Sequence, residues 1–451
     1  MIRDLTSGSV TRQLLIFALP FMLSNLLQTL YNLVDMVIVG RFVGAAGLSA
    51  VAIGGEALQL TTFIGMGFTS AGQILISQYV GRGDRDAVRR TIGTMFSCIL
   101  GASFVVMAAA CVLAHPLLRA LNTPDAAYGQ AYDYAIVCFA GTFFIFGYNI
   151  VSAVLRGMGD SQRPFVFIAI AAVTNLILDI VFVAGLKMGA RGAALATVIG
   201  QALSFVCSVI YLYRRRESFG FDFRPASFRP DGEAVRVLIR LGLPMCLQYS
   251  AICISQMFVN SFINAYGVTA SAVTGVGNKL GHIASVVTTS LNTAGSSMAG
   301  QNFGAGKPER VSRIMAVIAV VGCAFCAVLS AIMLAAPDAV FGLFNTDPDV
   351  LAMAPSYAPI AVLIFFGFAA RAPFIALING QGFASLSLVM GLIDSVVARV
   401  GLSYLLGVVL GRGIEGFWYG NAIAGYCPML IGGVYYFSGL WKKRRLLIRE
   451  D

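Results

Sequence analysis

The run LLIFALPFMLSNLLQTLYNLVDMVIVG, residues 14–40, carries a single charged side chain, Asp35. A membrane-spanning α-helix needs about 20 mainly apolar residues, so this run is long enough to cross a bilayer. It is too long for the apolar part of a cleaved signal peptide, and no small-residue cleavage site follows it. We therefore predict that the first helix of the chain is a retained membrane span.

The rest of the chain continues this apolar pattern. Of its 451 residues, 58% are hydrophobic and 12% are charged, and the mean hydropathy is +0.82. Soluble proteins carry about 25% charged residues, so we predict an all-α membrane protein. Gly, Pro and charged residues separate twelve predicted transmembrane helices. These helices cover residues 14–40, 50–80, 90–114, 130–156, 162–185, 192–213, 236–264, 271–301, 308–336, 350–379, 384–410 and 414–440.

The second half of the chain repeats the first at an offset of about 223 residues. Pro20 recurs as Pro244, and SQYVGRG at 77–83 recurs as GQNFGAG at 300–306. Six helices per copy is an even number, so both copies enter the membrane from the same side. We predict two pseudo-symmetric six-helix lobes around a central cleft. The predicted parts are an N-lobe at 1–213, a cytoplasmic linker at 214–235, a C-lobe at 236–440 and a basic tail at 441–451.

The basic residues predict the orientation in the membrane. With the N-terminus in the cytoplasm, 23 of the 31 Lys and Arg side chains fall on the cytoplasmic side, as the positive-inside rule expects. Both termini are then cytoplasmic, and we expect a prokaryotic plasma membrane protein. The net charge of +10 is explained by this orientation and by contact with anionic lipid, so we expect no nucleic-acid partner.

Several chemistries are disfavoured by the sequence. The nine cysteines lie in apolar runs, and His115 and His282 are the only histidines, so we expect neither a disulfide framework nor a metal cluster. The segment from Gly300 to Lys307 resembles a phosphate loop, but Pro308 stands where Ser or Thr belongs. We therefore expect no cofactor and no enzymatic activity. A duplicated chain favours a transporter; a channel or a membrane-embedded enzyme is the alternative from a different class.

Charged residues inside predicted membrane helices are functional candidates by default, because a charge in lipid is costly. On the first helix, Asn25, Gln28, Asn32 and Asp35 follow each other at spacings of three and four, which puts them on one face. The alternative is a seam of hydrogen bonds between packed helices.

A second polar group lies at the same depth as Asp35. Asn175 and Asp179 are four residues apart on the fifth predicted helix, and Thr197 lies about five residues into the sixth. At 1.5 Å per residue, Asp35, Asp179 and Thr197 all lie about 8–10 Å below the outer surface. Two carboxylates, an amide and a hydroxyl at one depth predict an oxygen cage for Na⁺, or a shared proton site.

Two further charge pairs are predicted. Glu56 and Lys279 occupy equivalent positions in the two repeats, and they either pair across the lobes or extend separately to the interface. Arg371 and Asp394 lie on neighbouring helices of the C-lobe, and we expect them to neutralise each other.

These residues, taken together, resemble the multidrug and toxic compound extrusion (MATE) family over essentially the whole chain. The segments that carry the resemblance are DLTSGS at 4–9, LYNLVD at 30–35, LRGMGD at 155–160, VGNK at 276–279 and GQNFGAG at 300–306.

The resemblance implies an antiporter that exports amphipathic, often cationic drugs or toxic metabolites in exchange for H⁺ or Na⁺. We expect the protein to be a monomer surrounded by membrane lipid. Its prokaryotic branch with a cation site in the N-lobe implies a coupling role for Asp35, Asn175, Asp179 and Thr197. The helix-7 carboxylate of another branch is missing here, which disfavours coupling through the C-lobe. Within transport, the alternative is a flippase for lipid-linked sugars. The residues expected to line the substrate cavity are Gln28, Asn32, Tyr134 and Gln256.

Overall fold

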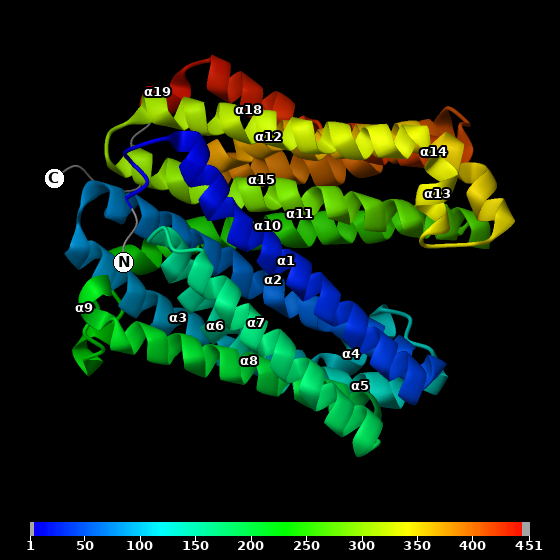
Figure 1. The fold of residues 1–451 in the computed structure, drawn as a ribbon, viewed down its shortest axis with the longest axis horizontal. Helices are drawn as coiled ribbons and strands as arrows, with labels where there is room; N and C mark the ends of the chain where they lie inside the picture. The colour runs from blue at the N-terminus through cyan, green and yellow to red at the C-terminus, as the bar shows by residue number, and fades with distance from the viewer. Residues whose placement is uncertain (1–3, 444–451) are drawn as a thin grey trace. The chain divides into compact units, whose positions relative to one another are not determined.

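The structure is a computed structural model that describes residues 4–443, and this range contains helices and no strand (Figure 1). Helices occupy all twelve predicted ranges. The first half contains α1 (Val10–Phe42), α2 (Ala45–Arg82), α3 (Arg85–Val112), α4 (Ala114–Ala120), α5 (Asp125–Ala140), α6 (Thr142–Gly157), α7 (Gln162–Asp179), the π-helix η1 (Ile180–Gly185), α8 (Gly189–Arg214), α9 (Arg216–Phe219) and the 3₁₀-helix η2 (Pro225–Phe228).

The second half contains α10 (Gly232–Asn264), α11 (Val268–Gly304), α12 (Pro308–Ala335), α13 (Pro337–Gly342), α14 (Pro348–Gly380), α15 (Ala384–Leu392), the π-helix η3 (Ile393–Val400), α16 (Gly401–Tyr404), the π-helix η4 (Leu405–Val409), α17 (Gly413–Ala424), α18 (Cys427–Phe437) and α19 (Leu440–Lys443).

Nine helices in the described range are long and apolar enough to span a membrane, or ten when α5 and α6, bent by 47°, count as one span. The other two predicted spans are α11, which is rich in Gly, Ser and Thr, and the broken pair α17 and α18. Length and hydropathy alone therefore undercount the spans, because polar residues and helix breaks interrupt the apolar signal.

The chain packs into two compact units. The first contains Leu19–Cys246, and the second contains Leu5–Ala18 together with the chain from Leu247 onward. Each division falls inside a long helix and within three residues of a proline, Pro20 in α1 and Pro244 in α10. The predicted lobes at 1–213 and 236–440 instead consist of whole helices, and their boundaries stay a prediction. Residues 444–451 of the predicted basic tail lie outside the described residues.

The first unit holds its helices together through small residues. Helices α7 and α8 lie side by side (Figure 1), and α2 packs against α5 and α6. A methyl group on Gly54 of α2 would lie 2.5 Å from the Tyr134 ring of α5, so only glycine permits this approach. Tyr134 belongs to a buried cluster with Val39 of α1, Val183 of η1 and Ala193 of α8. This cluster brings α1, η1 and α8 close together.

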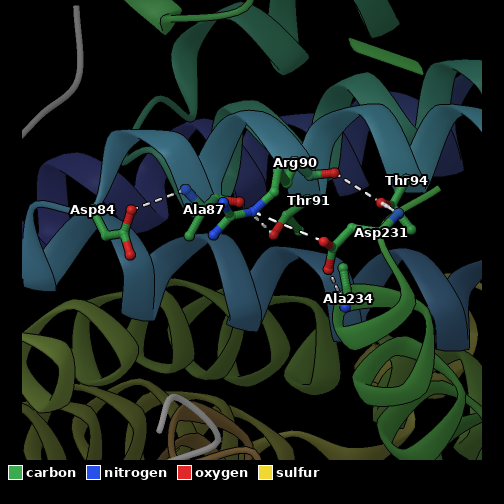
Figure 2. A network of polar contacts seen from close by, with 7 residues as sticks. All are labelled: Asp84, Ala87, Arg90, Thr91, Thr94, Asp231 and Ala234. Carbon is green, nitrogen blue, oxygen red and sulfur yellow. Dashed lines mark hydrogen bonds and ion pairs between the residues drawn. The ribbon is translucent and has the colours of Figure 1, made fainter. Parts of the chain in front are cut away.

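The linker before α10 is attached to α3, also within the first unit. Figure 2 shows Asp231 against Arg90 and Thr94: the Asp231 backbone N–H donates to Thr94 Oγ1 at 3.0 Å, and its carboxylate lies 3.9 Å from Arg90 Nε. The same carboxylate accepts a hydrogen bond from the Ala234 N–H at 2.9 Å and caps α10.

Within this linker, the Ser227 hydroxyl donates to Asp222 Oδ1 at 2.5 Å, which holds the pKa of the Asp222 carboxyl below its usual range.

The N-terminal segment is attached to the second unit in a comparable way. Gln301 Oε1 accepts from the Leu5 N–H at 3.1 Å, and Asn302 Nδ2 donates to the Leu5 carbonyl at 3.1 Å. Arg310 donates to the carbonyls of Gly8 and Ser7 at 3.0 and 3.2 Å. These side chains belong to the GQNFGAG repeat and to the helix that follows it, so the repeated motif anchors the segment before α1.

Candidate functional site

Two acidic side chains lie buried inside the first unit. Asp35, in the C-terminal third of α1, is 7% exposed, and Asp179 is fully buried at the last residue of α7. At Asp179 the winding changes from α to π, because η1 begins at the next residue. Such π-helical turns are frequent at functional sites because they redirect side chains.

The two carboxyl groups are within hydrogen-bonding reach of each other. Oδ1 of Asp35 and Oδ1 of Asp179 each lack a hydrogen-bond donor among the described residues. None of the four ion pairs found there involves either aspartate. Two ionised carboxylates in contact repel strongly, and a proton or a bound cation relieves that repulsion.

Asn175 and Thr197 complete the group. In the amide orientation that satisfies both neighbours, Asn175 Nδ2 donates to Asp179 Oδ2 at 3.2 Å and its oxygen accepts from the Thr197 backbone N–H at 3.3 Å. With the amide reversed, Nδ2 lies 3.4 Å from Thr197 Oγ1. Asn175 is buried and Thr197 is half-buried. The structure therefore brings together the four residues of the predicted coupling site.

Three further residues lie within electrostatic range of Asp35. They are Tyr31, Tyr134 and Cys138. Tyr134 was expected near the substrate cavity, whereas Tyr31 and Cys138 were not singled out. Tyr31 precedes Asp35 by four residues, and Cys138 follows Tyr134 by four, so each shares a helix face with a predicted residue. That spacing is the signal that could have identified them.

The other predicted cavity residues are less enclosed. Gln28 on α1 and Gln256 on α10 are half-buried, and Asn32 is exposed. Gln28 and Asn32 belong to the first unit and Gln256 to the second. Their assignment to a substrate cavity stays a prediction.

The predicted charge pairs have different surroundings. Glu56 and Lys279 are both exposed, and the Lys279 ammonium lies 5.7 Å from the centre of the Phe344 ring; a pair between them stays a prediction. In the second unit, Arg371 Nη1 lies 3.5 Å from Asp394 Oδ2, as expected of a neutralising pair. Arg399, which the sequence did not place in this pair, lies closer to Asp394.

Residues 4–443 contain no set of three His, Cys, Asp or Glu side chains placed to hold a metal ion. Oxygen atoms from carboxylate and hydroxyl groups are suited to a proton or a hard cation. The arrangement of Asp35, Asn175, Asp179 and Thr197 can thus hold one small positive charge.

Comparison with known proteins gives consistent matches. The sequence model of the MatE family matches residues 20–181 and 244–405. "Probable multidrug resistance protein YpnP" of Bacillus subtilis is 30% identical over 450 residues, covering 99% of each chain. "Probable multidrug resistance protein YoeA" of the same organism is 28% identical and covers 97% of this chain and 96% of that protein. A crystal structure of MATE in the bent conformation superposes with a TM-score of 0.87 at 22% identity, covering 97% of this chain and 98% of that chain.

Proposed function

Since this chain belongs to the MatE family of membrane transporters, we propose that it is a secondary active antiporter that exports amphipathic, often cationic drugs or toxic metabolites in exchange for H⁺ or Na⁺. The family is one of transporters, not enzymes, and the chain is a multi-pass membrane protein. The names of the relatives support multidrug resistance as the setting. The coupling ion and its site are our inference.

The observation that carries the proposal is the pair Asp35 and Asp179. Two buried carboxyls in contact, each with an oxygen that has no donor in the described chain, form a site that favours one exchangeable positive charge. A structural ion pair would instead contain a basic partner. The Asn175 amide donates to Asp179 Oδ2 and so holds this carboxyl in place, and the Thr197 hydroxyl lies beside the same amide.

Antiport requires that cation and drug oppose each other's binding. If a cation at Asp35 and Asp179 lowers the affinity for drug, the drug must lower the affinity for the cation by the same factor. Alternating access then follows when the cation-bound and drug-bound states open to opposite sides. On the outside, a proton or Na⁺ displaces the drug; on the inside, where that cation is scarcer, it leaves and the drug binds.

Orientation and location belong to the same proposal. The distribution of basic residues supports a cytoplasmic location for both termini, and we assign the protein to a prokaryotic plasma membrane as a monomer. The runner-up, a flippase for lipid-linked sugars, is expected to line its cavity with several cationic side chains. In the first unit, the described site instead presents two acidic groups, which favours cationic substrates.

A transport assay tests the proposal directly. Purified protein in liposomes, given a pH gradient or a Na⁺ gradient separately, should accumulate a fluorescent cationic drug under one of the two. If H⁺ is the coupling ion, raising the pH on the outer side should slow export, because fewer sites there acquire a proton. Drug movement that ignores both gradients would rule out cation antiport.

A further inference from the structure

A second group of charged side chains lies inside the second unit. Asp394 is 2% exposed and Arg399 is 5% exposed, and both lie on the π-helix η3. Arg399 Nη2 donates to Asp394 Oδ1 at 3.0 Å, and Arg371 of α14 reaches the other oxygen, Oδ2, at 3.5 Å. Two guanidinium groups therefore share one carboxylate.

This group carries one net positive charge, because two guanidinium groups share one carboxylate. A guanidinium stays protonated in proteins, and among the described residues Asp394 is the acid that lies within ion-pair distance of either arginine. An unpaired charge inside a membrane protein is costly. The excess charge therefore favours an anionic partner.

The arginines also retain unused donors. Arg399 Nη1 donates to Asn421 Oδ1 at 2.5 Å, whereas its buried Nε has no hydrogen-bond partner in the described chain. The Arg371 guanidinium lies 4.6 Å from the centre of the Phe368 ring, and its side chain is 22% exposed. Arg371 is thus the accessible member of the group, and Arg399 is the enclosed one.

The internal repeat shows where this group lies. Asn175 corresponds to Arg399 and Thr197 corresponds to Asn421, each at an offset of 224 residues, the same offset that separates Pro20 from Pro244. The contact between Asn175 and Thr197 in the first unit is therefore repeated as the contact between Arg399 and Asn421 in the second.

The two equivalent positions differ in the sign of their unsatisfied groups. Beside the Asn175–Thr197 contact, Oδ1 of Asp179 has no donor, whereas beside the Arg399–Asn421 contact, Nε of Arg399 has no acceptor. A site built on the same framework with the opposite sign should take a ligand group of the opposite charge.

We propose that Arg371, Asp394, Arg399 and Asn421 form a binding site for an anionic group of the carboxylate class. Guanidinium groups match the planar geometry of a carboxylate. Arg371 and the free Nε of Arg399 would donate to the ligand, while Asp394 and Asn421 hold the two guanidinium groups in place. A transported molecule with a carboxylate substituent would use this site, and the proposal does not depend on the identity of the coupling cation.

Thermal unfolding of the whole protein in nanodiscs of neutral lipid tests this site, because such nanodiscs contain no anionic headgroups. Sodium benzoate is compared with sodium chloride at equal ionic strength. We expect benzoate to raise the melting temperature by about 3 °C or more over chloride in the wild type. Arg371→Gln should remove this difference while leaving the Arg399–Asp394 pair intact, and Arg412→Gln, a change of an exposed arginine, should preserve it.

Asp394→Asn provides an independent test in the opposite direction. It removes the internal carboxylate that competes for both guanidinium groups, so the benzoate concentration that gives half of the stabilisation should fall about tenfold. The proposal is overturned if benzoate and chloride act alike on the wild type, or if Arg371→Gln keeps the full benzoate response. A response to chloride alone that needs Arg371 would identify a halide site and overturn the carboxylate assignment.

Discussion

Replacing the aspartates of the first unit one at a time is the most direct test of the coupling mechanism. Asp35→Asn and Asp179→Asn each preserve the size and shape of the side chain. An amide, however, neither exchanges a proton near neutral pH nor neutralises the charge of Na⁺. Both carboxyls are buried and in contact. Each change also removes the repulsion between like charges, so the variants should remain folded and melt at the wild-type temperature or above it.

The expected magnitude follows from the number of carboxyls. One pH unit is worth about 1.4 kcal/mol per proton, and each such amount corresponds to a tenfold concentration ratio. Two carboxyls in contact exchange one or two protons per cycle. With the membrane potential clamped at zero and a pH difference of one unit, the wild type should therefore hold a drug ratio of about ten, or about one hundred with two protons. A tenfold Na⁺ gradient gives the same value per Na⁺ ion.

The assay is the steady-state drug ratio across liposomes that contain each variant. Both Asn variants should fall to a ratio of about one, while the equilibrium affinity for drug changes by only about threefold, because binding uses more of the protein than the two carboxyls. Asp133→Asn on α5 is the matched control, since this carboxylate is exposed, and it should keep the full ratio. If both Asn variants held the wild-type ratio, the coupling site would lie elsewhere, and Glu56 would be tested next.

Two further outcomes test the fold. Gly93→Ala would place a methyl group 1.8 Å from the Ser227 carbonyl oxygen, so it should displace the linker from α3 and lower the free energy of unfolding by about 1–3 kcal/mol in thermal unfolding. In the control Gly101→Ala, on the same helix, the added methyl group meets nothing within 4 Å, and this change should be neutral or slightly stabilising. Equal losses of stability for the two variants would refute the contact. In intact cells, a Gly220→Cys variant should react with thiol reagents only from the cytoplasm and an Asn345→Cys variant only from outside, whereas reversed labelling would overturn the proposed orientation.

The sequence determined the helices and the repeat because both depend on local information. A membrane span is set by about 20 apolar residues in succession, and a duplication preserves spacing along the chain, as Pro20 and Pro244 show. Depth is also local, since each helical residue rises 1.5 Å. Counting residues therefore placed Asp35, Asp179 and Thr197 at one level, and the structure brings them together with Asn175. Helix breaks, such as the bend between α5 and α6, were not predicted because packing decides them.

The partners of Asp394 depended on the tertiary structure. In a regular α-helix, residues five apart point about 140° away from each other, at 100° per residue. Helical spacing therefore did not indicate a pair between Asp394 and Arg399. The structure winds residues 393–400 as a π-helix, whose hydrogen bonds join residues five apart and bring these side chains onto one face. Packing against α14 and α17 then adds Arg371 and Asn421. Local sequence signals give the spacing of charges along a helix, but the winding that aligns those charges is stabilised by neighbouring helices that lie far away in the chain.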